Sequence, residues 1–262
     1  MKKSQEEKIK IKNSFEVEDL RTELAFRKRY KDFKKTYSNK YPEINANNSG
    51  GYWDTKFNIP VKFSDLDGMT RDKINTIIKF LPEENSHILD LGIGQGYLEQ
   101  RLQELGKNYE LYGIDVSKRS IARLKKRIRG KFNIGNVLQI RNYYKKNYFD
   151  AVVAIELIEH ISPRKIFKLY KDIRSLLKPT GIFILSTPLN EGLKFMKENP
   201  SSHVREYTES IVFTELKLSG FRVLEKRCFF AFKNFYRIKR VISLLWGGRW
   251  KPNNIVIKAV KA

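Results

Sequence analysis

A glycine turn follows a short apolar strand in the stretch Ile88-Leu89-Asp90-Leu91-Gly92-Ile93-Gly94-Gln95-Gly96. Three glycines stand at alternate positions after the acid Asp90. Because glycine has no Cβ, the backbone can turn tightly there and let a ligand lie against it. The helix expected from about Tyr97 to Leu105 offers its N-terminal N–H groups to an anionic group of that ligand. A dinucleotide-binding fingerprint needs its third glycine one residue later, at Tyr97, so the spacing here is D-x-G-x-G-x-G instead.

Polar residues follow several of the expected strands. These strands lie near His87–Leu91, Glu110–Asp115, Lys131–Ile134, Phe149–Ile155 and Ile182–Ser186. They alternate with helices, which predicts a parallel sheet that is covered by helices on both faces. Ligands of such sheets bind at the carboxyl ends of the strands. Since Asp90, Asp115, Asn136 and Glu156 lie at or near these ends, one pocket can collect them, and Asp115 can accept the hydroxyl protons of a ribose.

In order and spacing, these motifs resemble those of the class I S-adenosylmethionine (SAM) methyltransferases over roughly residues 50–262. The resemblance implies a Rossmann-like three-layer α/β/α sandwich with a seven-stranded, mostly parallel sheet and an antiparallel last strand. It also implies SAM as the cofactor. The SAM-binding residues that it implies are Asp90, Gly92, Gly94, Gly96, Asp115, Asn136 and Glu156. Many relatives carry Asp in place of Asn136, although the carbonyl of Asn can still pair with the adenine amino group.

A cluster of acids and histidines follows the strand at Phe149–Ile155. Glu156, Glu159 and His160 are close enough on one turn to converge, and His203 lies in a later loop that can fold over the same opening. The catalytic candidates are therefore His160, His203 and Glu156, with a histidine as the base that deprotonates an alcohol or phenol acceptor.

Glu156, Glu159, His160 and His203 could instead bind Mg²⁺, Mn²⁺ or Zn²⁺. The pattern E-x-x-E-H with a distant histidine resembles the metal site of small-RNA 3′-terminal 2′-O-methyltransferases, and ubiquinone-biosynthesis O-methyltransferases carry a similar arrangement. E-x-x-E-H is also frequent in members of the superfamily with no known metal. The metal-free interpretation is therefore preferred, and the four-residue metal site is the alternative.

Composition limits the class of protein. The 262 residues carry a formal net charge of +23, and 41% of them are hydrophobic. No apolar run approaches the roughly 20 residues that span a bilayer, and the charged N-terminus has no apolar signal region. Because Cys228 is the single cysteine, no intrachain disulfide can form, so we expect a cytoplasmic protein. No acid occurs between Asp115 and Asp150, which leaves a basic surface for which nucleic acid is a possible partner.

The chain divides into an N-terminal helical extension and linker, residues 1–51, and a methyltransferase domain, residues 52–262. A helix is expected at about 13–37, and Asn47-Asn48-Ser49-Gly50-Gly51 favours turns that close the linker. Two last strands are expected at Phe221–Phe230 and Ile255–Val260. The segment between them mixes aromatic and basic residues. We expect its apolar side to pack on the sheet, and peripheral membrane contact is the alternative.

The sequence thus predicts an enzyme that transfers a methyl group from SAM to a small-molecule or lipid-linked acceptor, at oxygen. One alternative is a metal-assisted RNA 2′-O-methyltransferase, which the charge and the possible metal ligands favour. The other is a SAM-binding protein that has lost catalysis.

Overall fold

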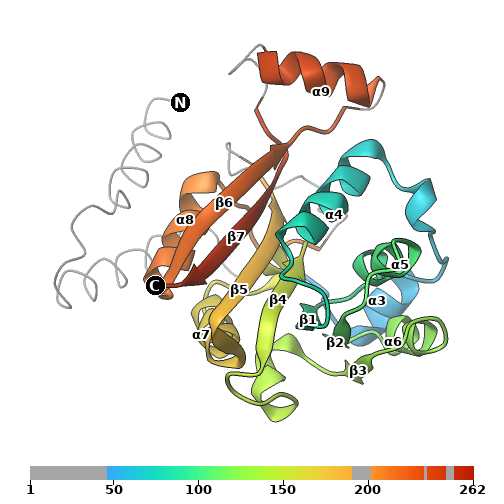
Figure 1. The fold of residues 1–262 in the computed structure, drawn as a ribbon, viewed down its shortest axis with the longest axis vertical. Helices are drawn as coiled ribbons and strands as arrows, with labels where there is room; N and C mark the ends of the chain where they lie inside the picture. Colours follow the sequence, from blue (N-terminus) through green and yellow to red (C-terminus); the bar gives the residue numbers. More distant parts are fainter. Residues whose placement is uncertain (1–45, 191–201, 233–234, 246–250) are drawn as a thin grey trace, which may run out of the picture.

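Seven strands form one sheet in the order β3-β2-β1-β4-β5-β7-β6 (Figure 1). The computed structural model describes residues 46–190, 202–232, 235–245 and 251–262. The strands are β1 His87–Leu91, β2 Glu110–Asp115, β3 Lys131–Ile134, β4 Phe149–Ile155, β5 Leu177–Pro188, β6 Phe221–Phe229 and β7 Asn254–Lys261. β7 lies between β5 and β6 and runs antiparallel to both, whereas β1 is parallel to β2 and β4. The predicted sheet is confirmed, including its antiparallel last strand.

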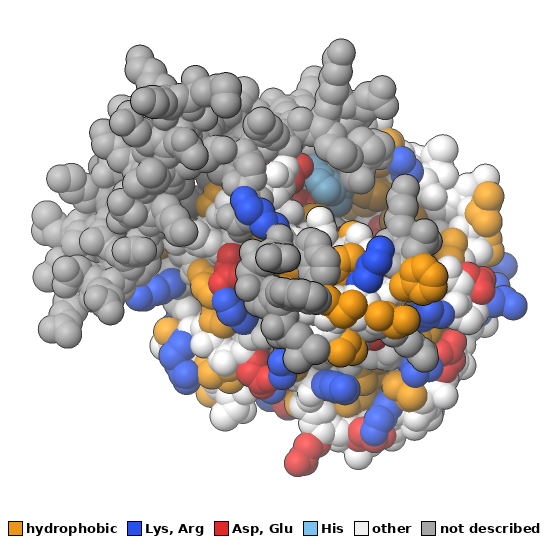
Figure 2. Space-filling model, turned by 90° about the horizontal axis from the view of Figure 1, so that it is seen from above, with side chains coloured by type: hydrophobic (Ala, Val, Ile, Leu, Met, Phe, Trp, Pro, Cys, Tyr) orange, Lys and Arg blue, Asp and Glu red, His pale blue; other side chains and the backbone are white. Residues whose placement is uncertain are grey.

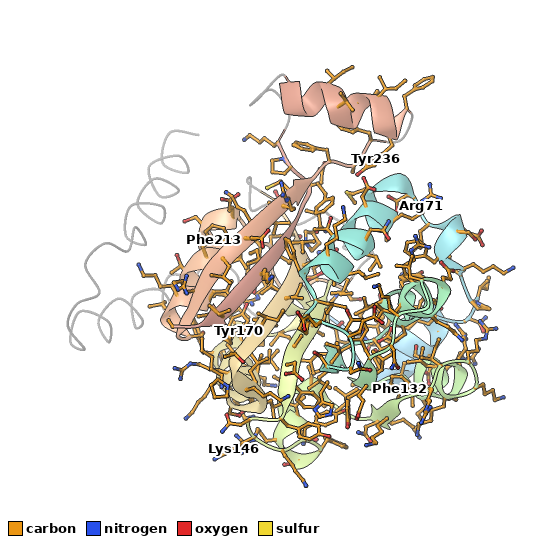
Figure 3. All side chains as sticks on the ribbon, in the orientation of Figure 1. Arg71, Phe132, Lys146, Tyr170, Phe213 and Tyr236 are labelled. Atoms are coloured by element: carbon orange, nitrogen blue, oxygen red, sulfur yellow. The ribbon has the colours of Figure 1, made fainter. Side chains whose placement is uncertain are left out.

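Helices cover both faces of the sheet. One face carries α4 (Gly68–Phe80), α5 (Tyr97–Glu104) and α6 (Lys118–Lys125), and the other carries η2 (Val137–Asn142), α7 (Ile166–Leu176) and α8 (Glu209–Leu218). Successive residues of a strand point to opposite faces. Ile88 accordingly packs in the same cluster as residues of α4 and α5, and Leu89 packs in the same cluster as α7. Phe132 and Tyr170, labelled in Figure 3, belong to these two separate cores.

The glycine turn between β1 and α5 adopts a conformation that side chains disfavour. Gly92, Gly94 and Gly96 have φ angles of 73°, 57° and 71°, which lie in the left-handed region. A Cβ at Gly96 would also stand 2.6 Å from the Leu124 side chain on α6. Glycine is therefore required here both for the turn and for the close approach of α6.

Helix α3 spans the predicted boundary between the linker and the domain. Gly50 and Gly51, expected in the linker, form the first residues of helix α3 (Gly50–Lys56). The Ser49 hydroxyl accepts a hydrogen bond from the Tyr52 N–H and caps the helix. A Cβ at Gly50 would lie 2.5 Å from the Val116 carbonyl oxygen, so this glycine serves close packing against the end of β2 rather than a turn. The helix predicted at 13–37 lies outside the described residues.

The insertion between β6 and β7 differs from its expected packing. It contains helix α9 (Tyr236–Leu245), which stands at the end of α4 rather than on the sheet (Figure 1). Tyr236, labelled in Figure 3, packs against Gly68 at the start of α4. Phe235, Ile238 and Val241 are exposed. On the face seen in Figure 2, hydrophobic and basic side chains are interspersed. None of the described helices is long and apolar enough to cross a membrane.

Candidate active site

A cavity of about 830 Å³ opens at the carboxyl ends of β1, β2 and β4. Most of the predicted site residues line it: Asp90, Gly92, Gly94, Asp115, Asn136, Glu156, Glu159, His160 and His203. Gly96 does not line the cavity but stands at the N-terminus of α5. The volume lies at the upper end of the range for small-molecule sites, roughly 300–1,000 Å³. One cavity thus joins the predicted cofactor residues to the predicted acceptor residues.

Asp115 fixes the shape of the cofactor half. One carboxylate oxygen, Oδ2, accepts a hydrogen bond from the Gly94 N–H at 2.8 Å, and Oδ1 accepts one from the Ser117 N–H at 2.7 Å. Burial raises the pKa of Asp115, and the two N–H groups oppose this rise. Each oxygen can accept a further hydrogen bond, so the carboxylate can receive both hydroxyls of a ribose. The residues present therefore fit a nucleoside.

Asn136 lies across the same half of the cavity. Its side-chain carbonyl caps η2 by accepting a hydrogen bond from the Leu138 N–H at 2.9 Å. The adjacent Val137 and Leu138 line the cavity and give it an apolar wall on which a flat ring can lie. The predicted adenine contact by Asn136 stays a prediction, because its carbonyl already holds a backbone N–H.

Glu156 lines the cavity and is held by one charged and two polar side chains. Its backbone is left-handed, with φ of 49°, and its carboxylate lies 3.1 Å from the Lys73 ammonium. Ser186 and Asn254 also donate hydrogen bonds to it, the shorter ones at 2.6 and 2.9 Å. Burial alone would raise the pKa of Glu156, but the Lys73 charge and these two donors outweigh it and lower that pKa. Glu156 is therefore held ionised and in one orientation.

Glu159 has the opposite surroundings. It is buried, its Oε2 accepts a hydrogen bond from Thr187 at 3.1 Å, and its Oε1 has no hydrogen-bond partner. Burial and the charge of Glu156 raise the pKa of Glu159 well above its usual range. A buried polar atom without a partner is uncommon in native proteins and points to a missing ligand or water.

The two predicted histidines meet beside Glu159. One ligand atom from each of Glu159, His160 and His203 lies within 4.8 Å of the others. Two ligands of one ion can be at most about 4.2 Å apart, so small side-chain rotations bring this set to a metal. Glu156, which the sequence grouped with them, does not belong to this set. The structure therefore brings together three of the four predicted metal ligands.

Each imidazole has an oxygen partner near its Nδ1. The His160 Nδ1 lies 3.1 Å from the Ser202 carbonyl, and the His203 Nδ1 lies 3.6 Å from the Glu206 carboxylate. Carbonyl and carboxylate partners of this kind commonly orient metal-binding histidines. Burial lowers the pKa of His160 to about 4, so its ring is neutral at neutral pH, the form that can bind a metal or accept a proton.

A buried ion pair fixes the loop that carries His203. Arg205 is fully buried and places its guanidinium 2.6 Å from the Glu215 carboxylate of α8. Tyr207 and Tyr170 also donate hydrogen bonds to Glu215. The Val204 N–H donates to the Glu159 carbonyl at 2.9 Å, which ties the loop directly to the short helix η3 (Ile158–His160).

Helix α3 supplies a wall of the cavity that the sequence did not predict. Tyr52, Trp53 and Phe57 line it, and Trp53 packs edge-on against the His160 ring at a centroid distance of 5.1 Å. The Ser117 hydroxyl and the Arg119 N–H both donate to Asp54, which fastens α3 to the start of α6. The sequence signal for this wall is the aromatic residues Tyr52 and Trp53 in one short helix and Phe57 directly after it.

Comparison with known proteins shows the family of this chain. Residues 82–238 match the family described as methyltransferase domain. Ubiquinone biosynthesis O-methyltransferase of Pelagibacter ubique (strain HTCC1062) is 30% identical over 118 residues, which cover 43% of this chain and 46% of the relative. Phosphoethanolamine N-methyltransferase of Plasmodium falciparum (isolate 3D7) is 24% identical over 171 residues, which cover 62% of this chain and 59% of the relative. The chain thus spans about half the length of these relatives.

Solved structures share the fold at low sequence identity. A SAM-dependent methyltransferase from Archaeoglobus fulgidus has a TM-score of 0.58 at 16% identity, covering 76% of this chain and 96% of that one. The [4+2]-cyclase SpnF has a TM-score of 0.61 at 15% identity, and the match covers 81% of this chain and 95% of that one. Identities this low show the fold alone, and the name of SpnF illustrates that one fold can carry different reactions.

Proposed function

The chain belongs to the SAM-dependent methyltransferases, and from that premise we propose that it methylates an oxygen atom of a small-molecule or lipid-linked acceptor. Its family is the one predicted from the glycine turn and the strand-end acids. The observation that carries the proposal is the junction of the cofactor half of the cavity with Glu159, His160 and His203. An acceptor at these three residues would lie in the same cavity as the methyl group of SAM.

Methyl transfer from a sulfonium is an in-line displacement, so positioning supplies much of the rate enhancement. Asp115 and the glycine turn would hold the nucleoside, and Glu156, fixed by Lys73, would border the reacting centre. An oxygen acceptor must also lose its proton. In the absence of a metal ion, the neutral His160 ring would accept a hydrogen bond from the hydroxyl of the substrate, beside the free oxygen Oε1 of Glu159.

We further propose that Glu159, His160 and His203 bind one divalent cation. The fit rests on the unsatisfied Glu159 oxygen and on the two imidazoles that have an oxygen partner near Nδ1. A bound ion would lower the pKa of an acceptor hydroxyl. The metal content of the purified full chain, measured by mass spectrometry after dialysis against Mg²⁺, Mn²⁺ or Zn²⁺, tests this. We expect one ion for the native chain and for Glu156→Gln, and none for Glu159→Gln. Equal metal content in all three would refute the site.

The acceptor class is tested with SAM that carries a tritiated methyl group. The full chain is incubated with lipid, polar-metabolite and RNA fractions of a cell extract, and mass spectrometry then identifies the methylated atom. We expect label on oxygen in the lipid or polar fraction. Label in RNA would support the RNA alternative, label on nitrogen would support a reaction like that of the phosphoethanolamine relative, and no label with intact SAM binding would support a non-catalytic protein.

The part of the basic stretch between α6 and β3 gives little support to RNA binding at the cavity. Lys125, Lys126, Arg127 and Arg129 are exposed at the end of α6 and in the turn before β3. Because β3 is parallel to β2, this turn lies at the amino edge of the sheet, whereas the cavity lies at the carboxyl edge. Basic residues at the C-terminus of a helix also complement its dipole, which is a sufficient reason for this cluster.

A further inference from the structure

We propose that Glu99, a residue outside the cavity, sets the preference for the positively charged methyl donor by sharing a proton with Asp90 and losing it when SAM binds. The proposal rests on the proposed SAM site and deepens it. SAM carries one more positive charge than its thioether product, S-adenosylhomocysteine, because the sulfonium becomes a neutral sulfur after transfer. A negative charge that appears only on binding a cation would therefore favour donor over product.

The geometry places two acids against each other under the glycine turn. Asp90 is 2% exposed and lines the cavity, and Glu99 on α5 is 1% exposed. A Cβ at Gly96 would lie 3.6 Å from Glu99 Oε2, so this oxygen lies directly against the turn. Asp90 Oδ1 and Glu99 Oε2 both lack a hydrogen-bond donor, although the two carboxyls are within hydrogen-bonding reach of each other. A proton shared by the two carboxyls would supply a donor where the pair has none.

The charged groups around the pair all favour retention of that proton. Asp115 on β2 adds a like charge, and Lys73 on α4 pairs instead with Glu156, the residue after β4. On α6 the nearest side chain to the turn is the apolar Leu124. In the described ranges, no ion pair reaches either acid.

The titration of the pair agrees with this geometry. Burial and the neighbouring acids Glu99 and Asp115 raise the pKa of Asp90 well above its usual range. Burial raises the pKa of Glu99 to about 7. The pair therefore keeps at least one proton at neutral pH, and a nearby cation would lower both pKa values and release a proton to solvent. Proton release makes SAM affinity rise with pH, by at most about tenfold per pH unit for one proton.

The experiment measures proton release directly by titration calorimetry of the full chain with SAM and with S-adenosylhomocysteine. Two buffers of different protonation enthalpy are compared at pH 6, 7 and 8. We expect close to one proton released per SAM and fewer for the product. The SAM-to-product affinity ratio should then increase about tenfold between pH 6 and 8. In Glu99→Gln the amide would donate to an ionised Asp90, so the proton release and the pH dependence of the ratio should both disappear.

Glu104→Gln is the matched control, because Glu104 lies on the same helix, is half exposed and pairs only with Arg101 among the described residues. It should keep the proton release of the native chain. Buffer-independent binding by the native chain, or undiminished release in Glu99→Gln, would overturn the proposal. Should Glu99→Gln not fold, the buffer dependence of the native chain still decides the matter. If SAM itself does not bind, the proposed function fails instead.

Discussion

Glu156 and Glu159 stand three residues apart beside one cavity, yet their surroundings are opposite. Glu156 receives an ammonium, a hydroxyl and an amide, which lower its pKa. Glu159 receives one hydroxyl and keeps an oxygen with no partner, and its pKa is raised. The more exposed of the two acids, Glu156, thus has three donors, and the buried Glu159 has one. Under the proposed function, a bound ligand would therefore supply the partner that the free oxygen of Glu159 lacks, whereas Glu156 needs none.

The largest expected effect comes from the buried ion pair that fixes the loop carrying His203. Arg205→Met removes the cation that faces Glu215 and leaves a buried acid unpaired. Breaking a buried pair in this way typically costs about 3–5 kcal/mol, and urea unfolding measures the loss. The double variant Arg205→Met with Glu215→Leu should recover part of it. If Arg205→Met alone costs less than about 1 kcal/mol, the ion pair does not hold the His203 loop.

A third acid, Glu99, extends the comparison of Glu156 and Glu159 to the pH dependence of stability. The pKa of Glu99 rises on folding from an ordinary 4.5 to about 7, so its contribution to stability is fully present below about pH 4.5. It is lost as the pH rises through about 7, by up to roughly 3 kcal/mol. Glu99→Gln should therefore gain stability relative to the native chain between pH 5 and pH 8, as urea unfolding at the two values would show. A constant difference between the two chains would contradict the raised pKa.

The stability of the site around Glu156 should depend on Lys73, which is distant in the sequence. Lys73→Met leaves the Glu156 carboxylate without its charge partner, and we expect a loss of about 2 kcal/mol, because Glu156 keeps Ser186 and Asn254 and its side chain is 33% exposed. SAM affinity, measured by calorimetry, should fall with it. Lys79→Met on the same helix is the control and should change neither quantity.

The smallest expected changes in stability have opposite signs for Glu159 and Glu156. Glu159→Gln replaces a buried acid that has one oxygen without a partner, so stability should stay equal or rise by up to about 1 kcal/mol. Glu156→Gln should instead lose about 1.5 kcal/mol, since its charge-assisted hydrogen bonds weaken. Thermal unfolding of the two variants in the presence of a chelator measures both. Destabilisation of equal size would show that the two acids are equivalent.

The pattern of apolar residues predicted the first strands of the sheet, because each strand is encoded by its own short stretch of sequence. The first four strands have their predicted bounds, since each is a short apolar run that ends beside a glycine or an acid. The site was predicted where its residues follow strand ends, as with Asp115, Glu159 and His160. His203 was added only because a loop after the fifth strand can reach the same edge.

The remaining features depend on contacts between distant parts of the chain. Lys73 looks like an ordinary polar position of a helix, yet it is 4% exposed because it meets Glu156, 83 residues later. Asn254, at the start of the last strand, also reaches Glu156. Gly50 reads as a linker residue, and only the nearby Val116 carbonyl explains it. No local pattern encodes such partners.

The place of β7 in the sheet has a consequence for the design of fragments of this chain. The region that matches the family ends at residue 238, before β7. Because β7 fills the gap between β5 and β6, a fragment of residues 82–238 would leave two facing strand edges with unpaired N–H and C=O groups and no neighbour for β6. It would also lack Lys73 and Asn254, both of which hold Glu156. Expression trials and truncations should therefore keep everything from helix α3 to Lys261, because the recognisable part of the sequence is smaller than the folding unit.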